Sequence, residues 1–302
     1  MTNEQRLKNL SVPTGRVDVV IDTDTYNECD DQFAIGYLLG AKEKLNLKAI
    51  YAAPFLNHLV KDAKEGMEKS YAEILNVLSL LGEEVDVFLG SETFLENEET
   101  PVISPVAKDL AERVKSYSPE NPLYVIAIGA ITNIASAILL NPQVAENTVV
   151  IWLGGHALHY HDILEFNMNE DIAAARVVFK SGVPIVQLPC CGVVNAFAVS
   201  EAELDYWFSG KNKFCDYLVA HAKKTAKDYS KGRAWSRVIW DVTAVAWLLN
   251  DNDEFMLSRI VPTHLPEYDG QYEENPDGLP MRYVYYIRRD NLLNDLINKI
   301  TE

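Results

Sequence analysis

Short apolar runs that alternate with longer helical patterns are the feature that most limits how this chain can fold. The runs are rich in β-branched residues, and each leads into a loop or a stretch with helical spacing. They are VDVVID (17–22), LKAIYAA (47–53), VDVFLG (85–90), LYVIAIG (123–129), NTVVIWLGG (147–155) and VPIVQLP (183–189). Strands of this kind are buried on both faces, so the pattern predicts an α/β fold with an open, mostly parallel central sheet and helices on both faces.

The pattern changes after residue 200. Helical spacing comes first, and two β-rich runs follow, FMLSRIV (255–261) and MRYVYYI (281–287). The stretch between them, PEYDGQYEENPDG (266–278), is polar and broken by Gly and Pro, as surface loops are. We therefore predict a helical C-terminal elaboration with a late strand pair. No repeat and no linker rich in Pro, Gly or Ser divides the chain, so residues 1–302 are predicted to form a single domain.

The charge balance limits the partners that the protein can have. Lys and Arg number 27 and Asp and Glu number 44, which gives a formal net charge of −17. Such a chain repels nucleic acid and anionic membranes, so neither is an expected partner. Residues 1–15 lack the apolar segment of a signal peptide, and no apolar run approaches the roughly 20 residues of a membrane helix. The four cysteines show no disulfide-like spacing, so we expect a cytoplasmic protein.

An acidic cluster directly after the first predicted strand is the strongest functional feature. Four aspartates and a glutamate, namely Asp22, Asp24, Glu28, Asp30 and Asp31, fall within ten residues. In open α/β sheets ligands bind beyond the carboxyl ends of the strands. So much negative charge is costly unless a cation compensates it, and carboxylates suit Ca²⁺ or Mg²⁺. A solvated loop whose Asp30 only caps the next helix is the simpler interpretation, but the position between an apolar strand and an apolar helix disfavours it.

An acidic pair in this place also resembles the DxDxT motif of haloacid-dehalogenase-like phosphatases. Asp22 would then be the nucleophile, which forms an aspartyl phosphate in the presence of Mg²⁺, and Asp24 the acid. Tyr26 stands where that motif has Thr or Val, and the motif gives no role to Asp30 and Asp31. A phosphatase is therefore the alternative enzyme.

Four blocks in the same order resemble the inosine–uridine-preferring nucleoside hydrolase family. The first, VIDTD…DDQFAIGYLL, is similar to a strand, the motif DTDPGxDD and a helix. The others are IAIGAITNIASAILLNP (126–142), WLGG…EFNMNEDIAAARVVFKSGVPI (152–185) and IWDVTAVAWLL (239–249). The resemblance implies an enzyme that hydrolyses the N-glycosidic bond of ribonucleosides to free base and ribose, with a small-molecule ribonucleoside as its partner.

The resemblance also implies a Ca²⁺ site. Its protein ligands would be Asp24, Asp31, Asp241 and the backbone carbonyl of Ile128, and Asp24 would be the general base for a water bound to the metal. The chemistry agrees with these roles. Cleavage passes through an oxocarbenium-like sugar, which an anionic site stabilises. A divalent cation lowers the pKa of its water, and a nearby carboxylate can then remove the proton.

The same alignment implies how ribose is bound. Asp30 would hold the 2′-hydroxyl, Asn167 and Asp241 the 3′-hydroxyl, and Glu165 the 5′-hydroxyl, while Asn57 would line the pocket. A carboxylate accepts a hydrogen bond from a 5′-hydroxyl but repels a 5′-phosphate. Nucleosides rather than nucleotides are therefore the predicted substrates.

One departure from the family pattern lies inside the acidic cluster. Five residues, Thr25 to Cys29, separate Asp24 from Asp30, where the family has three. The insertion removes a Pro-Gly turn and adds Glu28, which is either an extra ligand or a solvated bystander.

A second departure concerns the leaving base. Trp240 precedes Asp241, where many members have a His that protonates the base and members selective for purines have Trp. Stacking on an indole favours purine nucleosides, although Trp240 can also be a core residue. His159 aligns with a substrate-binding Asn of the family and is a candidate donor.

Two further expectations concern the pocket mouth and the assembly. Tyr229 and Trp235 are candidates for a mobile lid over the base, unless they belong to a solvated helix face. The resemblance implies a homo-dimer or homo-tetramer. A catalytically silent nucleoside-binding homologue is the non-enzymatic alternative, because the leaving-group His is absent and the acidic loop is longer.

Overall fold

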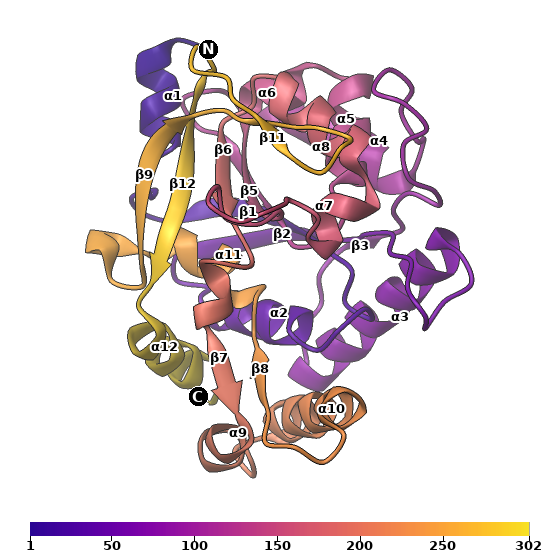
Figure 1. Cartoon of the computed structure of the whole chain (residues 1–302), viewed down its shortest axis with the longest axis vertical. Helices are drawn as coiled ribbons and strands as arrows, with labels where there is room; N and C mark the ends of the chain where they lie inside the picture. Colours follow the sequence, from indigo (N-terminus) through magenta and orange to yellow (C-terminus); the bar gives the residue numbers. More distant parts are fainter. Residues whose placement is uncertain (302) are drawn as a thin grey trace.

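The computed structural model describes residues 1–301, except for the side chains of Asp228 and Tyr229. An eight-stranded sheet runs through the described chain in the order β3-β2-β1-β4-β5-β6-β12-β9 (Figure 1). The six predicted strands form its parallel part: β1 (Val17–Thr23), β2 (Leu45–Ala52), β3 (Val87–Phe88), β4 (Leu123–Ala127), β5 (Thr148–Leu153) and β6 (Ile185–Leu188). The predicted mostly parallel sheet is thus confirmed.

Side chains of each central strand alternate between two apolar cores. In β1, Val19 and Ile21 pack into one core and Val20 into the other. One core is closed by α2 (Asp31–Gly40), α3 (Ala63–Leu81), α10 (Lys213–Ser230), α11 (Val242–Leu248) and α12 (Arg289–Thr301). The other is closed by α4 (Pro105–Arg113), α5 (Thr132–Leu140), α6 (Gln143–Asn147) and α8 (Ile172–Lys180). Helices therefore cover both faces, as the apolar strands predicted.

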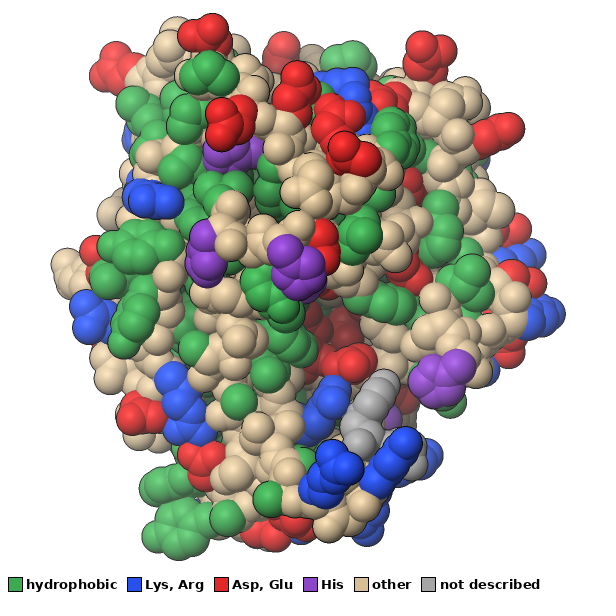
Figure 2. Space-filling model, viewed as in Figure 1, with side chains coloured by type: hydrophobic (Ala, Val, Ile, Leu, Met, Phe, Trp, Pro, Cys, Tyr) green, Lys and Arg blue, Asp and Glu red, His purple; other side chains and the backbone are tan. Residues whose placement is uncertain are grey.

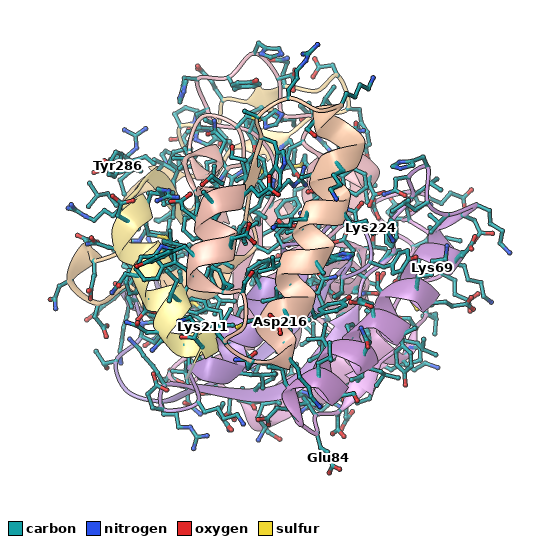
Figure 3. The ribbon with its side chains drawn as sticks, turned by 90° about the horizontal axis from the view of Figure 1, so that it is seen from below. Lys69, Glu84, Lys211, Asp216, Lys224 and Tyr286 are labelled. Carbon is teal, nitrogen blue, oxygen red and sulfur yellow. The ribbon has the colours of Figure 1, made fainter. Side chains whose placement is uncertain are left out.

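The late strand pair is confirmed and extends the main sheet. β12 (Pro280–Ile287) runs parallel to β6 and antiparallel to β9 (Met256–Pro262). The helical elaboration contains α9 (Glu201–Trp207) and α10. A two-stranded antiparallel sheet, formed by β7 (Ala198–Ser200) and β8 (Ser236–Val238), connects it to the core. Figure 3 shows the molecule from below, and in this view α10 lies between α12 and α3.

The shorter elements complete the chain. They are α1 (Asn3–Asn9), α7 (Phe166–Glu170), β10 (Leu265–Pro266), β11 (Tyr272–Glu273) and three single 3-10 turns, Val114–Ser116, Val194–Ala196 and Asp251–Asp253. Within residues 1–301, none of the helices combines the length and the apolar character that crossing a membrane requires.

Local sequence explains where the longest helix starts and stops. The side chain of Asp62 accepts a hydrogen bond from the backbone N–H of Glu65 and thereby caps the first turn of α3. Gly82 ends the helix in the left-handed conformation, with φ of +68°. A side-chain cap at one end and a glycine at the other thus set the limits of this helix.

Candidate active site

A cavity of about 480 Å³ opens where the carboxyl ends of the parallel strands meet the following loops. In the space-filling view a hollow near the middle of the face has acidic atoms at its bottom (Figure 2). Its size and mixed lining suit a small organic ligand. The cavity wall includes the predicted residues Asp24, Asp30, Asp31, Asn57, Ile128, Glu165, Asn167, Trp240 and Asp241.

Three buried aspartates form the tightest group in this wall. Asp30, Asp31 and Asp241 each offer one carboxylate oxygen, and these atoms lie within 4.8 Å of one another. Asp24 lines the same cavity and is 2% exposed. The structure thus brings the predicted metal ligands Asp24, Asp31 and Asp241 to one cavity, and it adds Asp30 to the tight group.

Two of these aspartates occupy the N-cap positions of helices without capping them. Asp30 precedes α2 and Asp241 precedes α11, and neither side chain makes a capping hydrogen bond. An aspartate at this position ordinarily accepts a backbone N–H, as Asp62 does. The interpretation of Asp30 as a simple helix cap is therefore wrong, because both carboxylates are directed to the acidic group instead.

Burial makes the ionised state of this group costly. It raises the pKa of Asp31 to about 6. The pKa values of Asp24, Asp30 and Asp241 are raised well above the usual range, first by burial and then by repulsion between neighbouring carboxylates. The charge of a bound divalent cation would offset both effects, and several carboxylates with a backbone carbonyl form a donor set of hard oxygens. The residues present thus fit such a cation.

Two threonines at the end of β1 orient one of the aspartates. The hydroxyl of Thr23 donates to Oδ1 of Asp31 at 2.5 Å, and it lies 2.8 Å from the hydroxyl of Thr25. Neither threonine was predicted to have a role, although both lie inside the acidic motif.

Glu165 and Asn167 are held by the backbone around the cavity. The carboxylate of Glu165 accepts hydrogen bonds from the backbone N–H groups of Gly155, Asn167 and Met168, at 2.9, 2.8 and 3.1 Å. Burial nevertheless raises the pKa of Glu165 to about 7. The side-chain amide of Asn167 donates to the carbonyl oxygens of Ile128 and Leu153 at 3.2 and 3.0 Å. Both side chains are therefore fixed before any ligand arrives.

The inserted segment is fastened by a residue that the sequence analysis did not assign. Arg237 of β8 makes an ion pair with Glu28 at 2.5 Å, and the carboxylate of Glu28 belongs to the cavity wall. Glu28 thus has a guanidinium partner and is not a solvated bystander. The basic stretch from 223 to 237 was visible in the sequence, but the pairing joins positions 209 residues apart.

Aromatic and imidazole groups lie on other parts of the wall. Trp240 is half-buried, lines the cavity and also packs against the larger core. His156 lines the cavity, whereas His159, exposed and beside Gly192, lies outside the described wall. Of the two lid candidates, Trp235 packs against the core, and the side chain of Tyr229 is outside the described residues.

Asp22 has a different environment from the other aspartates. Its side chain is fully buried, and Oδ1 accepts a hydrogen bond from the amide of Asn133 at 2.7 Å. Burial raises the pKa of Asp22 to about 7. Among the described residues Asp22 is not part of the cavity wall, so the nucleophile of the phosphatase alternative has no access to a substrate there.

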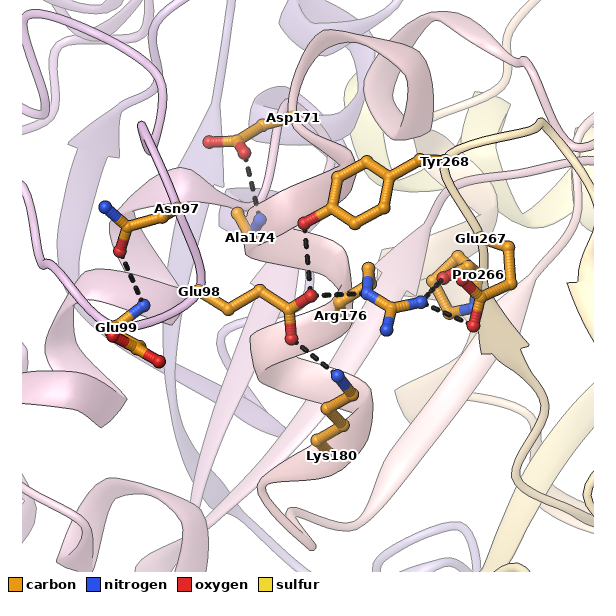
Figure 4. A network of polar contacts seen from close by, with 10 residues as sticks. All are labelled: Asn97, Glu98, Glu99, Asp171, Ala174, Arg176, Lys180, Pro266, Glu267 and Tyr268. Atoms are coloured by element: carbon orange, nitrogen blue, oxygen red, sulfur yellow. Dashed lines mark hydrogen bonds and ion pairs between the residues drawn. The ribbon is translucent and has the colours of Figure 1, made fainter.

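The loop after β3 is fastened away from the cavity. Glu98 bonds to Arg176 and Lys180 of α8 at 2.5 and 2.6 Å and to the hydroxyl of Tyr268 at 3.1 Å (Figure 4). Arg176 also forms an ion pair with Glu267 at 2.6 Å. No residue of the loop 89–104 belongs to the described wall of the cavity, so this wall is built by other segments.

Comparison with known proteins agrees with this architecture. The family model described as inosine-uridine preferring nucleoside hydrolase matches residues 19–275. A pyrimidine-specific ribonucleoside hydrolase RihA from Citrobacter koseri is 29% identical over 150 residues, which cover 47% of each chain. RihA from Escherichia coli O1:K1 / APEC is 26% identical over 175 residues, 56% of this chain and 53% of that protein. The chain thus matches about half the length of these curated relatives.

Solved structures share the whole fold at low sequence identity. A purine-preferring ribonucleoside hydrolase from Gardnerella vaginalis superposes with a TM-score of 0.74 at 20% identity, over 94% of this chain and 98% of that one. The type III effector protein XopQ, in complex with adenosine diphosphate ribose, superposes with a TM-score of 0.72 at 15% identity, over 99% and 96%. Because the family model covers most of the sequence and the acidic motif lies in the expected cavity, the chain belongs to the inosine-uridine preferring nucleoside hydrolase family.

Proposed function

We propose that the protein hydrolyses the N-glycosidic bond of ribonucleosides and releases the free base and ribose. The observation that carries this proposal is the cavity itself, in which Asp24 lies beside the group formed by Asp30, Asp31 and Asp241. Developing positive charge on a ribosyl group is stabilised by such a concentration of carboxylates. Membership of the family supports the same reaction.

The proposed cation is Ca²⁺, held by Asp24, Asp31, Asp241 and the carbonyl oxygen of Ile128. When bound, it supplies a positive charge that acidifies water and neutralises the buried carboxylates. Asp24 then accepts the proton of the attacking water at its carboxylate. Burial and the neighbouring Asp31 raise the pKa of Asp24 in the cation-free site. A bound cation would lower this pKa again, so that the carboxylate is ionised and can serve as the base.

The ribose would be oriented by side chains of three segments. Asp30 is proposed to accept from the 2′-hydroxyl, Asn167 and Asp241 to bind the 3′-hydroxyl, and Glu165 to bind the 5′-hydroxyl. The three backbone N–H groups that already hold Glu165 fix its position and support this role. A phosphate in place of the 5′-hydroxyl would be repelled, so nucleosides are preferred over nucleotides.

The preference for one kind of base is the most detailed part of the proposal. Trp240 in the cavity wall supports stacking on a purine. The names of known relatives point both ways, since RihA is called pyrimidine-specific and the Gardnerella vaginalis enzyme purine-preferring. We therefore propose purine nucleosides and use the ranking of bases as the test.

Wider aspects of the proposal concern the assembly and the cellular role. We expect a single domain, a homo-dimer or homo-tetramer, and a role in nucleoside salvage in the cytoplasm. Light scattering of the purified protein measures the oligomeric state directly.

The decisive experiment measures ribose release from inosine, guanosine, adenosine, uridine and cytidine, with added Ca²⁺ and again after chelation. The proposal expects chelator-sensitive release that is lost in Asp24→Asn and kept in Asp62→Asn, because Asp62 caps α3 and is not part of the described cavity wall. Binding of nucleosides without release of any base would instead support the silent nucleoside-binding alternative. That alternative arises because Trp240 stands where many family members have the leaving-group His.

A further inference from the structure

Asn27 lies in the inserted part of the acidic loop and contacts the carboxylate of Asp24. Its side-chain Nδ2 donates to Oδ2 of Asp24 at 3.0 Å, and its backbone N–H donates to the carbonyl oxygen of Asp24 at 2.7 Å. Asn27 is half-buried and belongs to the cavity wall. The contact is therefore made inside the proposed active site, by a residue that the DTDPGxDD pattern does not contain.

A second asparagine fixes the direction of this contact. The backbone N–H of Leu59 donates to Oδ1 of Asn57 at 2.8 Å, and Nδ2 of Asn57 donates to Oδ1 of Asn27 at 2.7 Å. A backbone N–H can only donate, so the amide of Asn57 has its oxygen toward Leu59 and its nitrogen toward Asn27. Asn27 must then present its nitrogen to Asp24, as a carboxylate acceptor requires.

Both segments that carry this chain of hydrogen bonds are anchored at other points. The backbone N–H of Leu56, next to Asn57, donates to the carboxylate of Glu170 at 2.5 Å. On the other side, Gln32 donates to the carbonyl oxygen of Thr25 at 2.8 Å. The two asparagines are thus presented from segments that the rest of the protein holds in place.

The neighbours of Asp24 explain what this arrangement achieves. A Cβ built on Gly129 would lie 3.2 Å from Oδ1 of Asp24, so that oxygen lies against a residue without a side chain. The hydrogen bond from Asn27 engages the other oxygen, Oδ2, and opposes rotation of the carboxylate about its Cβ–Cγ bond. A carboxylate that both binds a cation and accepts a proton needs such a fixed orientation.

We propose that Asn27 is a positioning residue, oriented by Asn57, that fixes the carboxylate of Asp24 for cation binding and proton transfer. This inference rests on the proposed function, in which Asp24 is the base. The longer loop thereby supplies a side-chain amide where the family pattern has a Pro-Gly turn.

The test compares Asn27→Ala, Asn57→Ala and the double variant, with Asn291→Ala as the matched control. Asn291 lies in α12, and its side chain likewise makes a hydrogen bond, to the carbonyl oxygen of Glu254 at 3.0 Å. Asn27→Ala is expected to lower kcat by roughly 10- to 100-fold and to weaken Ca²⁺ binding, measured by calorimetry, by roughly tenfold, while KM for the nucleoside changes little. Asn57→Ala should give a smaller loss in the same direction.

The double variant separates positioning from a general loss of structure. If Asn57 acts only through Asn27, its replacement costs nothing further once Asn27 is Ala, so the two losses in kcat are not additive. Fully additive losses, or an Asn27→Ala protein with the kcat and Ca²⁺ affinity of the Asn291→Ala control, would overturn the proposal. Should Asn27→Ala melt far below the control, Asn57→Ala retains the Asn27 side chain but removes the hydrogen bond that orients it, and its loss of kcat and of Ca²⁺ affinity gives the decisive reading.

Asp24→Asn distinguishes this failure from failure of the proposed function. If Asp24→Asn keeps its kcat, Asp24 is not the base and the proposed mechanism is wrong. If Asp24→Asn is inactive but Asn27→Ala behaves as the control, the mechanism stands and the positioning role of Asn27 is wrong. Ca²⁺ affinity gives the same comparison without turnover.

Discussion

Two groups of charged side chains in this molecule are built in opposite ways. In the cavity beyond β1, Asp24, Asp30, Asp31 and Asp241 lie together, and burial raises the pKa of all four, with repulsion from neighbouring carboxylates as a further cause for Asp24, Asp30 and Asp241. Around Glu98, by contrast, two cations of the chain face the carboxylate (Figure 4). Burial tends to raise the pKa of Glu98, but hydrogen bonds from Lys180 and Arg176 outweigh it, so its pKa is lowered.

The difference shows which charges the chain neutralises itself. The group at Glu98 is complete, and it fastens a loop to α8. The group at Asp24 contains more carboxylate than Arg237, the guanidinium that pairs with Glu28, can balance. A protein that keeps an uncompensated acidic group in a cavity is organised for a positive ligand, either a cation or a developing carbocation.

The largest expected effect on activity comes from a substitution in the first group, the aspartates of the cavity. Asp241→Asn removes a proposed cation ligand and a contact to the 3′-hydroxyl, so we expect kcat/KM for ribose release to fall on the order of 10³-fold. Glu98→Gln should change it by less than about twofold, because surface ion pairs act on stability by only about 0.2–1 kcal/mol. Initial rates on the best nucleoside measure both. Comparable losses in the two variants would contradict the division between the groups.

Addition of Ca²⁺ should stabilise the protein through the first group alone. At a free Ca²⁺ concentration 100-fold above Kd, binding to the folded state contributes about 2.7 kcal/mol to the free energy of unfolding. Calorimetric unfolding with and without chelator should show this difference in the natural protein and in Glu98→Gln, and should lose most of it in Asp31→Asn. An equal Ca²⁺ effect in Asp31→Asn would place the cation elsewhere.

The strand half of the fold could be predicted because the relevant pattern is local. Each central strand is a run of apolar residues such as Val19, Val20 and Ile21, whose alternate side chains must enter two cores. Such runs predict a covered parallel sheet without knowledge of any contact. Two elements were predicted less well. The run 85–90 forms only the short strand β3 (Val87–Phe88), and α12 was not predicted at all. The extent of an edge strand and the presence of a terminal helix depend on their packing partners.

The candidate site was predictable to the extent that its residues lie in short motifs. Asp24, Asp30 and Asp31 follow one strand, so their convergence follows from the chain path alone. The ion pair of Glu28 with Arg237 joins segments that are far apart in sequence, and no local pattern specifies it. The resemblance to the family directed attention to Ile128 and Asp241, which also line the cavity, because a family pattern carries contacts that one sequence does not display.

The two groups should also respond to pH with opposite sign. Asp31 of the first group has a pKa raised to about 6, and Glu165, which lines the same cavity, has one raised to about 7. The folded, cation-free protein therefore holds protons that the unfolded chain releases near pH 4. Their contribution to stability is therefore lost as the pH rises from about 4 to about 7. The lowered pKa of Glu98 has the reverse effect, and its contribution is lost as the pH falls through that lowered value.

The sign of the pH dependence in the cavity predicts that Ca²⁺ stabilises the folded protein more at higher pH. Because the cation replaces protons on the carboxylates, the Ca²⁺-dependent part of the free energy of unfolding should grow between about pH 5 and pH 7.5. Urea unfolding with and without chelator at the two pH values measures it. A Ca²⁺ effect that stays constant over this interval would show that the carboxylates are already ionised in the cation-free protein.

The smallest expected effect on catalysis comes from a substitution in the second group, the ion pairs around Glu98. Arg176 is 9% exposed and bonds to Glu98, Glu267 and the carbonyl oxygen of Pro266. Arg176→Met leaves these acceptors without their partner and should lower the free energy of unfolding by about 1–3 kcal/mol, while kcat stays unchanged because the loop 89–104 does not line the cavity. Arg259→Met, at an exposed position of β9, is the matched control. A loss of kcat in Arg176→Met alone would mean that the fastened loop reaches the substrate during turnover, so the second group would also serve the chemistry of the first.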